Sequence, residues 1–186
     1  MQSPANRRSN LHMVDITLKK TTVRTAVATG KLFLSVETLN RLRVSSLPKG
    51  DALAAAQVAG IQAAKRTYDL IPMCHPLMLT SIDLAFALEL EAKPNRLSDG
   101  FSLPGKRIGA VSITASVKTA AQTGVEMEAL TAVAVAALTI YDMCKGLDRE
   151  MVIGEIALLS KTGGQSGDFP PIGLCPSDNR STGRRK

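Results

Sequence analysis

Residues 81–91 read SIDLAFALELE and residues 111–117 read VSITASV. Both segments place an apolar residue at every second position, which is the spacing of a β-strand with one buried face. We expect the two strands to pair antiparallel, because they follow one another in the chain. The segment between them, 93–107, holds two prolines, two glycines and several charges, and it is longer than most hairpin loops. The sequence therefore predicts an antiparallel sheet that carries an exposed insertion.

Two helical segments accompany these strands. Residues 51–68 start at Asp51, a favourable N-cap, are apolar on nearly every turn, and cannot continue as a helix past Pro72. Residues 125–145 are rich in Ala and Val and precede Gly146, a residue suited to a C-cap. Weaker patterns fit two more strands and one short helix, at 23–35, 153–159 and 36–43. Interleaved helices and antiparallel strands predict an α+β fold with the helices packed on one face of the sheet.

The composition describes a globular domain with basic ends. Of the 186 residues, 45% are hydrophobic and 21% are charged, which is ordinary for a soluble globular chain. The net charge is +7, and residues 1–10 and 176–186 contribute +2 and +3 of it. We expect a disordered lead-in at 1–11, one domain at 12–169, and a disordered basic tail at 170–186. A nucleic-acid partner is not expected, because the chain has only four Phe, two Tyr and no Trp to stack on bases.

Cysteine and histidine usage argues against disulfides and metal ions. Cys74, Cys144 and Cys175 form no CxxC pair. This suits a reducing compartment, either the bacterial cytoplasm or the mitochondrial matrix, rather than secretion. With two histidines in the chain, no metal site is expected. The apolar stretch 129–141 is about 13 residues long and is bounded by acids, so we expect neither a membrane span nor a membrane partner.

The helix expected at 125–145 carries acidic and basic side chains. Asp142 and Lys145 are three residues apart and share a face, and Glu128 lies about 40° from Asp142 around the helix. A carboxylate beside an ammonium group suits general acid or base chemistry. The alternative is an exposed ion pair that contributes about 0.5 kcal/mol or less to stability. Spacing alone leaves both interpretations open.

Three other segments could take part in chemistry. In Cys74-His75-Pro76, the histidine could hydrogen-bond a substrate, activate Cys74 as a nucleophile, or only form a turn. Lys49 precedes a helix N-terminus, where backbone amides attract anions, although a simple turn is the alternative. The loop 161–168, KTGGQSGD, exposes amides that favour an anion. Lys65, near the other end of that helix, is explained by the helix dipole alone.

Six segments in a fixed order carry more information than any one of them. They are HMVD (12–15), PKGDALAAAQVAGIQAAKRT (48–67), LIPMCHPLML (70–79), TGVEMEALTA (123–132), AALTIYDMCK (136–145) and KTGGQSGDF (161–169). Together they resemble the cyclic pyranopterin monophosphate synthase family of molybdenum-cofactor biosynthesis. The resemblance extends from about Leu11 to Phe169 and is interrupted by the 93–107 insertion.

The resemblance implies a ferredoxin-like α+β subunit that forms a homohexamer, a trimer of dimers, with active sites shared across a subunit interface. The implied enzyme is a lyase that converts (8S)-3′,8-cyclo-7,8-dihydroguanosine 5′-triphosphate to cyclic pyranopterin monophosphate and releases diphosphate. No metal or other cofactor is implied. An oligomer is also expected because the helix at 125–145 is apolar on all sides and needs another surface to cover it.

Matched motif by motif, the resemblance assigns the catalytic acid or base to Asp142, with Lys145 beside it and Lys49 as an essential partner. It assigns substrate binding to Met73, Cys74, His75, Met127 and Glu128 and, by less specific matches, to Glu126, Arg24, Lys65 and Lys161. We also expect crowding to lower the pKa of one lysine, so that a neutral amine can act as a base.

Two other functions are consistent with the residues. Gln165 stands where many family members have Lys, and neither the insertion nor the basic tail has a counterpart in the family. These departures would suit a catalytically silent member that binds a nucleotide or a partner protein. The adjacency of Cys74 and His75 would instead suit a hydrolase that depends on Cys74.

Overall fold

The computed structural model describes residues 11–92, 108–164 and 167–169. Residues 1–10 of the predicted lead-in, the 93–107 insertion, Gln165 and the basic tail lie outside the described residues. The elements are, in chain order, β1 (Thr22–Ser35), α1 (Val36–Arg43), α2 (Ala52–Lys65), α3 (Thr67–Leu70), β2 (Leu79–Glu89), β3 (Ile108–Ala121), α4 (Glu126–Cys144) and β4 (Val152–Thr162).

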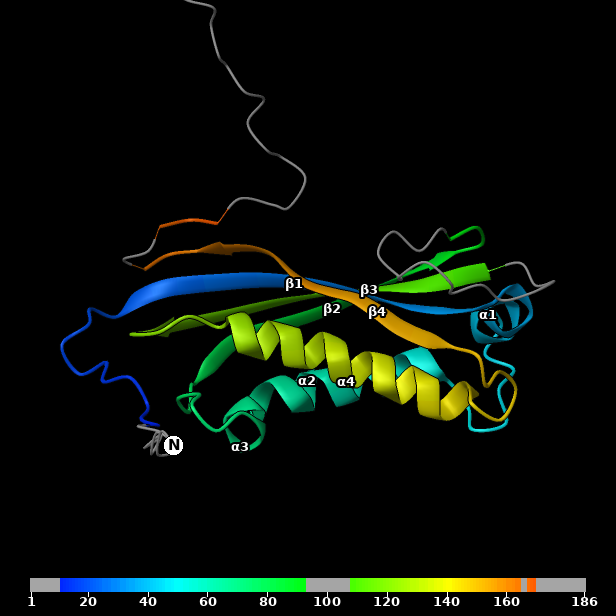
Figure 1. Ribbon diagram of the computed structural model, residues 1–186, viewed down its shortest axis with the longest axis horizontal. Helices are drawn as coiled ribbons and strands as arrows, with labels where there is room; N and C mark the ends of the chain where they lie inside the picture. The colour runs from blue at the N-terminus through cyan, green and yellow to red at the C-terminus, as the bar shows by residue number, and fades with distance from the viewer. Residues whose placement is uncertain (1–10, 93–107, 165–166, 170–186) are drawn as a thin grey trace, which may run out of the picture.

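The four strands form one antiparallel sheet in the order β2-β3-β1-β4. The connection from β1 to β2 contains α2, and the connection from β3 to β4 is α4, which is the β-α-β-β-α-β order of the ferredoxin-like fold. Both long helices lie on the same face of the sheet (Figure 1). The predicted α+β fold, with antiparallel pairing and helices on one face, is confirmed.

The face of the sheet beneath the helices is built from small and branched apolar residues. On β1, Ala28 pairs with Ala115 of β3 and with Leu158 of β4, so these three side chains point to the same face. Leu32 and Ile113 on that face are fully buried. The apolar residues that recur at every second position in the sequence therefore lie on the helix-covered face, and the residues between them lie on the open face.

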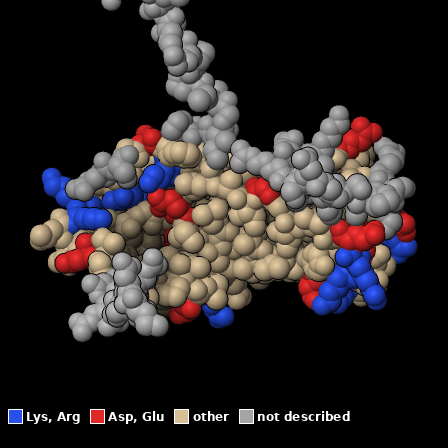
Figure 2. Space-filling model, in the orientation of Figure 1, with Lys and Arg blue, Asp and Glu red and all other residues tan. Residues whose placement is uncertain are grey.

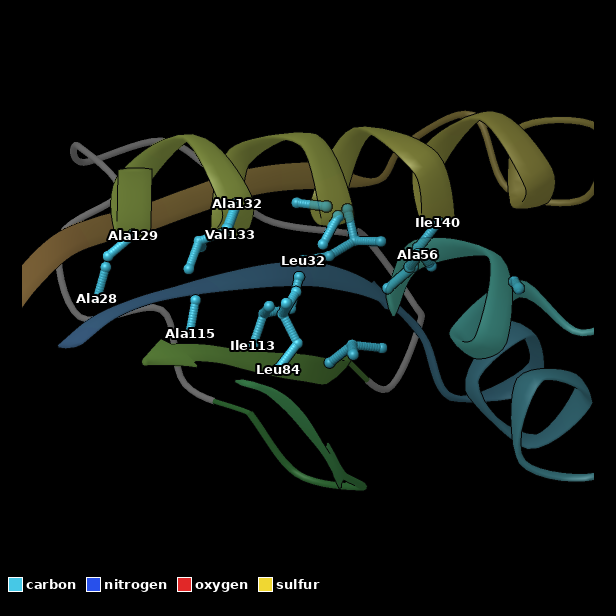
Figure 3. Close-up of a cluster of buried hydrophobic side chains, with 14 of the residues drawn as sticks. Ala28, Leu32, Ala56, Leu84, Ile113, Ala115, Ala129, Ala132, Val133 and Ile140 are labelled. Atoms are coloured by element: carbon cyan, nitrogen blue, oxygen red, sulfur yellow. The ribbon is translucent and has the colours of Figure 1, made fainter. Parts of the chain in front are cut away.

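Helix α4 packs on that face through alanines and valines. Ala129, Ala132, Val133 and Ile140 are fully buried and point toward Ala28, Leu32, Ile113 and Ala115 of the sheet (Figure 3). By length and composition alone α4 could cross a membrane, since the whole helix is longer than its apolar stretch at 129–141. Its packing against the sheet and α2 identifies it as the core helix of this fold. The two ends of α4 are thereby fixed relative to the sheet.

The long helix expected at 51–68 is two helices in the structure. Asp51 caps α2 as expected, since its side chain accepts hydrogen bonds from the backbone amides of Leu53 and Ala54, both at 3.0 Å. The chain leaves helical geometry at Arg66, and Thr67 begins the short α3. Thr67 is buried, and its hydroxyl donates to the carbonyl oxygen of Ala63 at 3.2 Å. The composition did not reveal this break, because the residues on both sides of Arg66 are compatible with a helix.

Gly60 sets how closely α2 approaches α4 and the sheet. A Cβ atom at this position would lie 2.5 Å from Cδ2 of Leu84 and 3.0 Å from the carbonyl oxygen of Ala132. We predict that Gly60→Val destabilises the fold by about 1–3 kcal/mol through overpacking, measured by the midpoint of urea unfolding at fixed protein concentration. Ala54→Val, on the exposed side of the same helix, is the control and should cost about 0.5 kcal/mol. Equal midpoints for the two variants would contradict this account of the packing.

Candidate active site

The predicted catalytic residues meet at the C-terminal end of α4. Lys49 Nζ lies 2.7 Å from Asp142 Oδ2, and Lys145 Nζ lies 2.7 Å from Asp142 Oδ1. Lys49 also donates to the backbone carbonyl oxygen of Asp142 at 3.2 Å. One carboxylate therefore joins two ammonium groups from distant parts of the sequence, and all three side chains are more than half exposed. We call Lys49, Asp142 and Lys145 the lysine–aspartate triad.

The triad lies on the wall of an open cavity of about 640 Å³. The start of α2 lies beside the end of α4, which is why Lys49, just before the N-cap Asp51, reaches Asp142. Arg149 adds a third positive side chain to the wall, and Tyr141, Met143 and Leu147 supply apolar surface. Three cations and one acid in one cavity suit an anionic ligand with an apolar or ring portion.

Within the triad, Asp142 and Lys145 stabilise each other's charged form. Hydrogen bonds from Lys145 and Lys49 lower the pKa of Asp142 to about 2, so this carboxylate is ionised at neutral pH. In return, the hydrogen bond to Asp142 raises the pKa of Lys145. Lys145 is therefore not the lysine whose pKa crowding was expected to lower, because the nearest charge to its ammonium group is negative.

A second group of predicted residues surrounds the N-terminal end of α4. An open cavity of about 460 Å³, which we call the cationic cavity, is lined by Lys19, Arg24, Glu126, Lys161 and neighbouring residues. Lys161 Nζ lies 3.0 Å from Glu126 Oε1. Arg24 Nη2 donates to the carbonyl oxygen of Gln122 at 3.2 Å, while its buried Nε has no hydrogen-bond partner among the described residues. An unsatisfied buried guanidinium N–H favours an anion at this place.

The Gly163-Gly164 pair makes room for Arg24. A Cβ atom on Gly164 would lie 2.1 Å from Arg24 Nη1, and the φ angle of +92° at Gly164 also favours glycine. The loop expected to bind an anion through its amides therefore also holds the arginine in the cavity wall. Gln165, the departure from the family pattern, lies outside the described residues.

A smaller cavity of about 180 Å³ adjoins the cationic cavity, since both are lined by Thr123, Gly124 and Glu126. Its other walls are the expected substrate-contacting segments, which come from the α3–β2 loop and the first turn of α4. They are Met73, Cys74, His75, Leu77, Met127 and Glu128, and we call this the Cys74–Glu128 cavity.

The Cys74–Glu128 cavity holds groups that are protonated more readily than usual. Glu128 is only 4% exposed, and burial, with a smaller contribution from Glu126, raises its pKa. Burial and the charge of Glu128 likewise raise the pKa of the Cys74 thiol. A raised thiol pKa is the opposite of what activates a nucleophilic cysteine, so it disfavours the Cys74-dependent hydrolase.

The two groups of residues are far apart within one subunit. From Glu126 to Asp142 the helix rises about 24 Å at 1.5 Å per residue. Glu128 and Asp142, which share a face by spacing, differ in environment, since one is buried and the other exposed. The two acids lie in similar directions around the helix, as the spacing predicted, but they do not meet within a single subunit. Figure 2 shows Lys and Arg gathered toward the two ends of this face, with mostly uncharged surface between them.

Two further lysines, Lys65 and Lys19, lie elsewhere than the sequence predicted or were not predicted at all. Lys65 is exposed in the last turn of α2 and lines none of these three cavities. Sequence reasoning missed Lys19, which lines the cationic cavity from the turn before β1, because it belongs to no recognisable motif. Over the described ranges, no cluster of three or more His, Cys, Asp or Glu side chains could hold a metal ion.

The fold and these cavities define a class of protein: a ferredoxin-like subunit whose long core helix has a cavity lined by Lys and Arg side chains at each end. A family model described as the MoaC family matches residues 13–164. The chain belongs to the MoaC family, and the family predicted from the six segments is confirmed.

Similar proteins carry a consistent name. A cyclic pyranopterin monophosphate synthase from Brevibacillus brevis is 52% identical over 164 residues, covering 88% of this chain and 92% of the relative. The protein of the same name from Thermoanaerobacter sp. is 51% identical over 162 residues, covering 87% and 92%. That from Clostridium acetobutylicum is 45% identical over 169 residues, covering 91% and 95%.

The raised pKa of Glu128 predicts a pH-dependent stability. A raised pKa means that the folded protein binds this proton more tightly than the unfolded chain, so stability is lost as the pH rises from the ordinary value of 4.5 through the folded pKa. We predict that Glu128→Gln is more stable than the wild type at pH 8 and that the difference disappears on acidification, measured as Tm against pH. Glu37→Gln, at an exposed position of α1, is the control. The same pH dependence for both variants would refute the prediction.

Proposed function

We propose that this chain is a cyclic pyranopterin monophosphate synthase, a phosphorus–oxygen lyase acting on the cyclised dihydro-GTP. The observation that carries the proposal is the lysine–aspartate triad on an anion-binding cavity, in a chain about 50% identical to proteins of that name. The product would enter molybdenum-cofactor biosynthesis. The relatives are bacterial, and for a bacterial source we expect the enzyme in the cytoplasm.

The triphosphate accounts for the cations. Conversion of a triphosphate to a cyclic monophosphate requires that a hydroxyl of the same molecule attack the α-phosphorus, that the bond to the β-phosphate oxygen break, and that the hydroxyl proton leave. Ammonium groups such as Lys49 and Lys145 would stabilise the charge that develops on the departing diphosphate. Arg24 and Lys161 in the cationic cavity are suited to bind phosphate oxygens.

Asp142 has a role that depends on those lysines. While both ammonium groups are bound to it, its low pKa makes it a weak base. Phosphate oxygens would compete for Lys49 and Lys145, and loss of either hydrogen bond would raise the pKa of Asp142. Substrate binding would thereby convert the carboxylate from an ion-pair partner into a better proton acceptor.

The Cys74–Glu128 cavity is suited to the guanine-derived ring. Carboxylates accept hydrogen bonds, and the guanine edge offers N–H donors. Glu126 and Glu128 would supply such acceptors, while Met73 and Met127 would contact the ring faces. A buried carboxylate with a raised pKa, such as Glu128, is also suited to proton transfer during ring formation. The proposed reaction assigns no role to Lys65 and requires no cofactor.

One subunit does not bring these parts together, so we place each active site between two subunits. The outward face of α4 carries an apolar strip at helical spacing, with Met127 and Leu138 exposed and Leu130, Ala134 and Tyr141 half-buried. If a second copy packs on this strip with its α4 antiparallel, the triad of each subunit meets the N-terminal cavities of the other. A two-fold axis then gives two equivalent sites per dimer, and three dimers would form the hexamer.

The turnover assay tests the function directly. Given the cyclised dihydro-GTP, the protein should release diphosphate and form a product that oxidises to a fluorescent pterin. We predict that Asp142→Asn, Lys49→Ala and Lys145→Ala each lower turnover about 100-fold or more. The first removes the proton acceptor, and the other two remove cations that would stabilise the departing diphosphate. Lys118→Ala, an exposed lysine on β3, is the control. Full turnover by the three variants would defeat the role assignments, and ligand binding without turnover by the wild type would favour a silent family member.

Mixed oligomers test where the active site lies. Lys145→Ala and His75→Ala impair opposite ends of α4, so an oligomer refolded from both contains some sites built only from intact halves. We predict that an equimolar mixture of the two inactive variants recovers about a quarter of the wild-type activity. Lys145→Ala mixed with Lys49→Ala, which impair the same end, should recover none. No recovery in the first mixture, or a monomeric mass by light scattering, would exclude the shared site.

A further inference from the structure

The segment that contains the HMVD motif has no role in the scheme above. Residues 11–20 precede β1 and form neither a helix nor a strand, and most of their side chains are exposed. Leu18 is 98% exposed, so the segment gains little from hydrophobic burial. Its position must therefore depend on a few polar contacts, and these contacts lead to the two cavities at the N-terminal end of α4.

Residues 14–19, which we call the strap, are attached at two points. His75 Nε2 lies 2.8 Å from the carbonyl oxygen of Val14, and Gln122 Nε2 donates to the carbonyl oxygen of Thr17 at 3.3 Å. His75 lines the Cys74–Glu128 cavity and Gln122 lines the cationic cavity. The strap thus spans from the wall of one cavity to the wall of the other, and Lys19 at its end belongs to the second wall.

The strap also has internal order. The Asp15 carboxylate oxygen Oδ1 accepts a hydrogen bond from the Thr17 backbone amide at 2.8 Å and from the Thr17 hydroxyl at 2.6 Å. The amide of Lys19 donates to the carbonyl oxygen of Ile16 at 2.9 Å. These bonds hold the Val14 and Thr17 carbonyl groups in a fixed relation to each other, although the segment is exposed.

The contact between Val14 and His75 constrains the imidazole. A carbonyl oxygen can only accept, so the Nε2 atom that faces it must carry the hydrogen. In a neutral imidazole the second nitrogen, Nδ1, then has the free lone pair. Since Nε2 is occupied by the backbone, Nδ1 is the ring nitrogen left for a ligand in the Cys74–Glu128 cavity.

We infer that the strap is a positioning element of the active site: the Val14 carbonyl group fixes His75 as the Nε2–H tautomer, so that Nδ1 accepts a hydrogen bond from an N–H group of the bound ring. This inference rests on the proposed function for the identity of the ring. Val14 acts through His75, and Asp15 acts through the turn that holds Val14. Within HMVD, this arrangement uses the backbone carbonyl group of Val14 and the side-chain carboxylate of Asp15.

The tautomer is read by nitrogen NMR of the histidine side chains at a pH where the rings are neutral. The chain has two histidines, so the His12→Asn variant leaves the signals of His75 alone. We expect a protonated Nε2 and an unprotonated Nδ1. An Nδ1–H tautomer, or an equal mixture, would overturn the inference whatever the enzyme activity.

The strap itself is tested by hydrogen exchange of residues 14–19. His75→Ala removes the donor to Val14 and should raise exchange about fivefold or more, as expected for the loss of about 1 kcal/mol. His75→Gln, whose side-chain amide can donate to the same carbonyl oxygen, should keep exchange close to wild type. Equal exchange in all three proteins would show that His75 does not hold the strap.

Kinetics connect the strap to the ligand. Asp15→Ala removes the two hydrogen bonds that Thr17 donates to Asp15, without altering a cavity-lining residue. We expect it to raise KM about fivefold with kcat nearly unchanged, because the bond to the ring forms on binding. Asp69→Ala, an exposed acid in α3, is the matched control for charge. An unchanged KM for Asp15→Ala overturns the inference, whereas absence of turnover by the wild type, with the expected NMR and exchange results, overturns only the proposed function.

Discussion

The packing of α4 on the sheet is the constraint on which the rest of the structure depends. Its buried face is mostly alanine and valine, and it lies on Ala28, Ala115 and Leu32, so helix and sheet approach closely along the whole helix (Figure 3). A 19-residue helix held in this way is a rigid rod of about 28 Å. Functional side chains at its two ends therefore cannot approach each other within one subunit.

The two ends differ in their electrostatics. At the C-terminal end, an exposed aspartate is stabilised in its ionised form by two lysines from different elements. At the N-terminal end, a buried glutamate is shifted toward its neutral form beside a histidine fixed by the backbone of the strap. The C-terminal end thus presents two lysines around one carboxylate, and the N-terminal end combines the cations Arg24 and Lys161 with a buried carboxyl group. Under the proposed function both ends would be needed, because the reaction forms a ring and expels diphosphate.

Much of this could be predicted from the sequence, and the errors have physical causes. Alternation located β2 and β3, and the Asp51 cap located the start of α2, because these signals depend on neighbouring residues alone. The break at Arg66 separates α2 from α3, and no local sequence pattern marks it. Lys19 was missed because its place in the cavity wall follows from the path of the strap. Helical spacing gave the relative direction of Glu128 and Asp142 around α4, but it did not show that one would be buried and the other exposed.

The sequence by itself determined the α+β fold, the family and the residue types of the candidate site, since periodicity and motif order are properties of the chain. Only the tertiary structure decided that Lys49 meets Asp142, that Arg24 and Lys161 share a wall with Glu126, and that Val14 holds His75. These contacts join residues far apart in sequence, and they form only where the sheet register and the packing of α2 beside α4 bring them within hydrogen-bonding distance. Burial of apolar surface supplies most of the folding free energy that fixes these positions, and the polar residues of the candidate site contribute little of it.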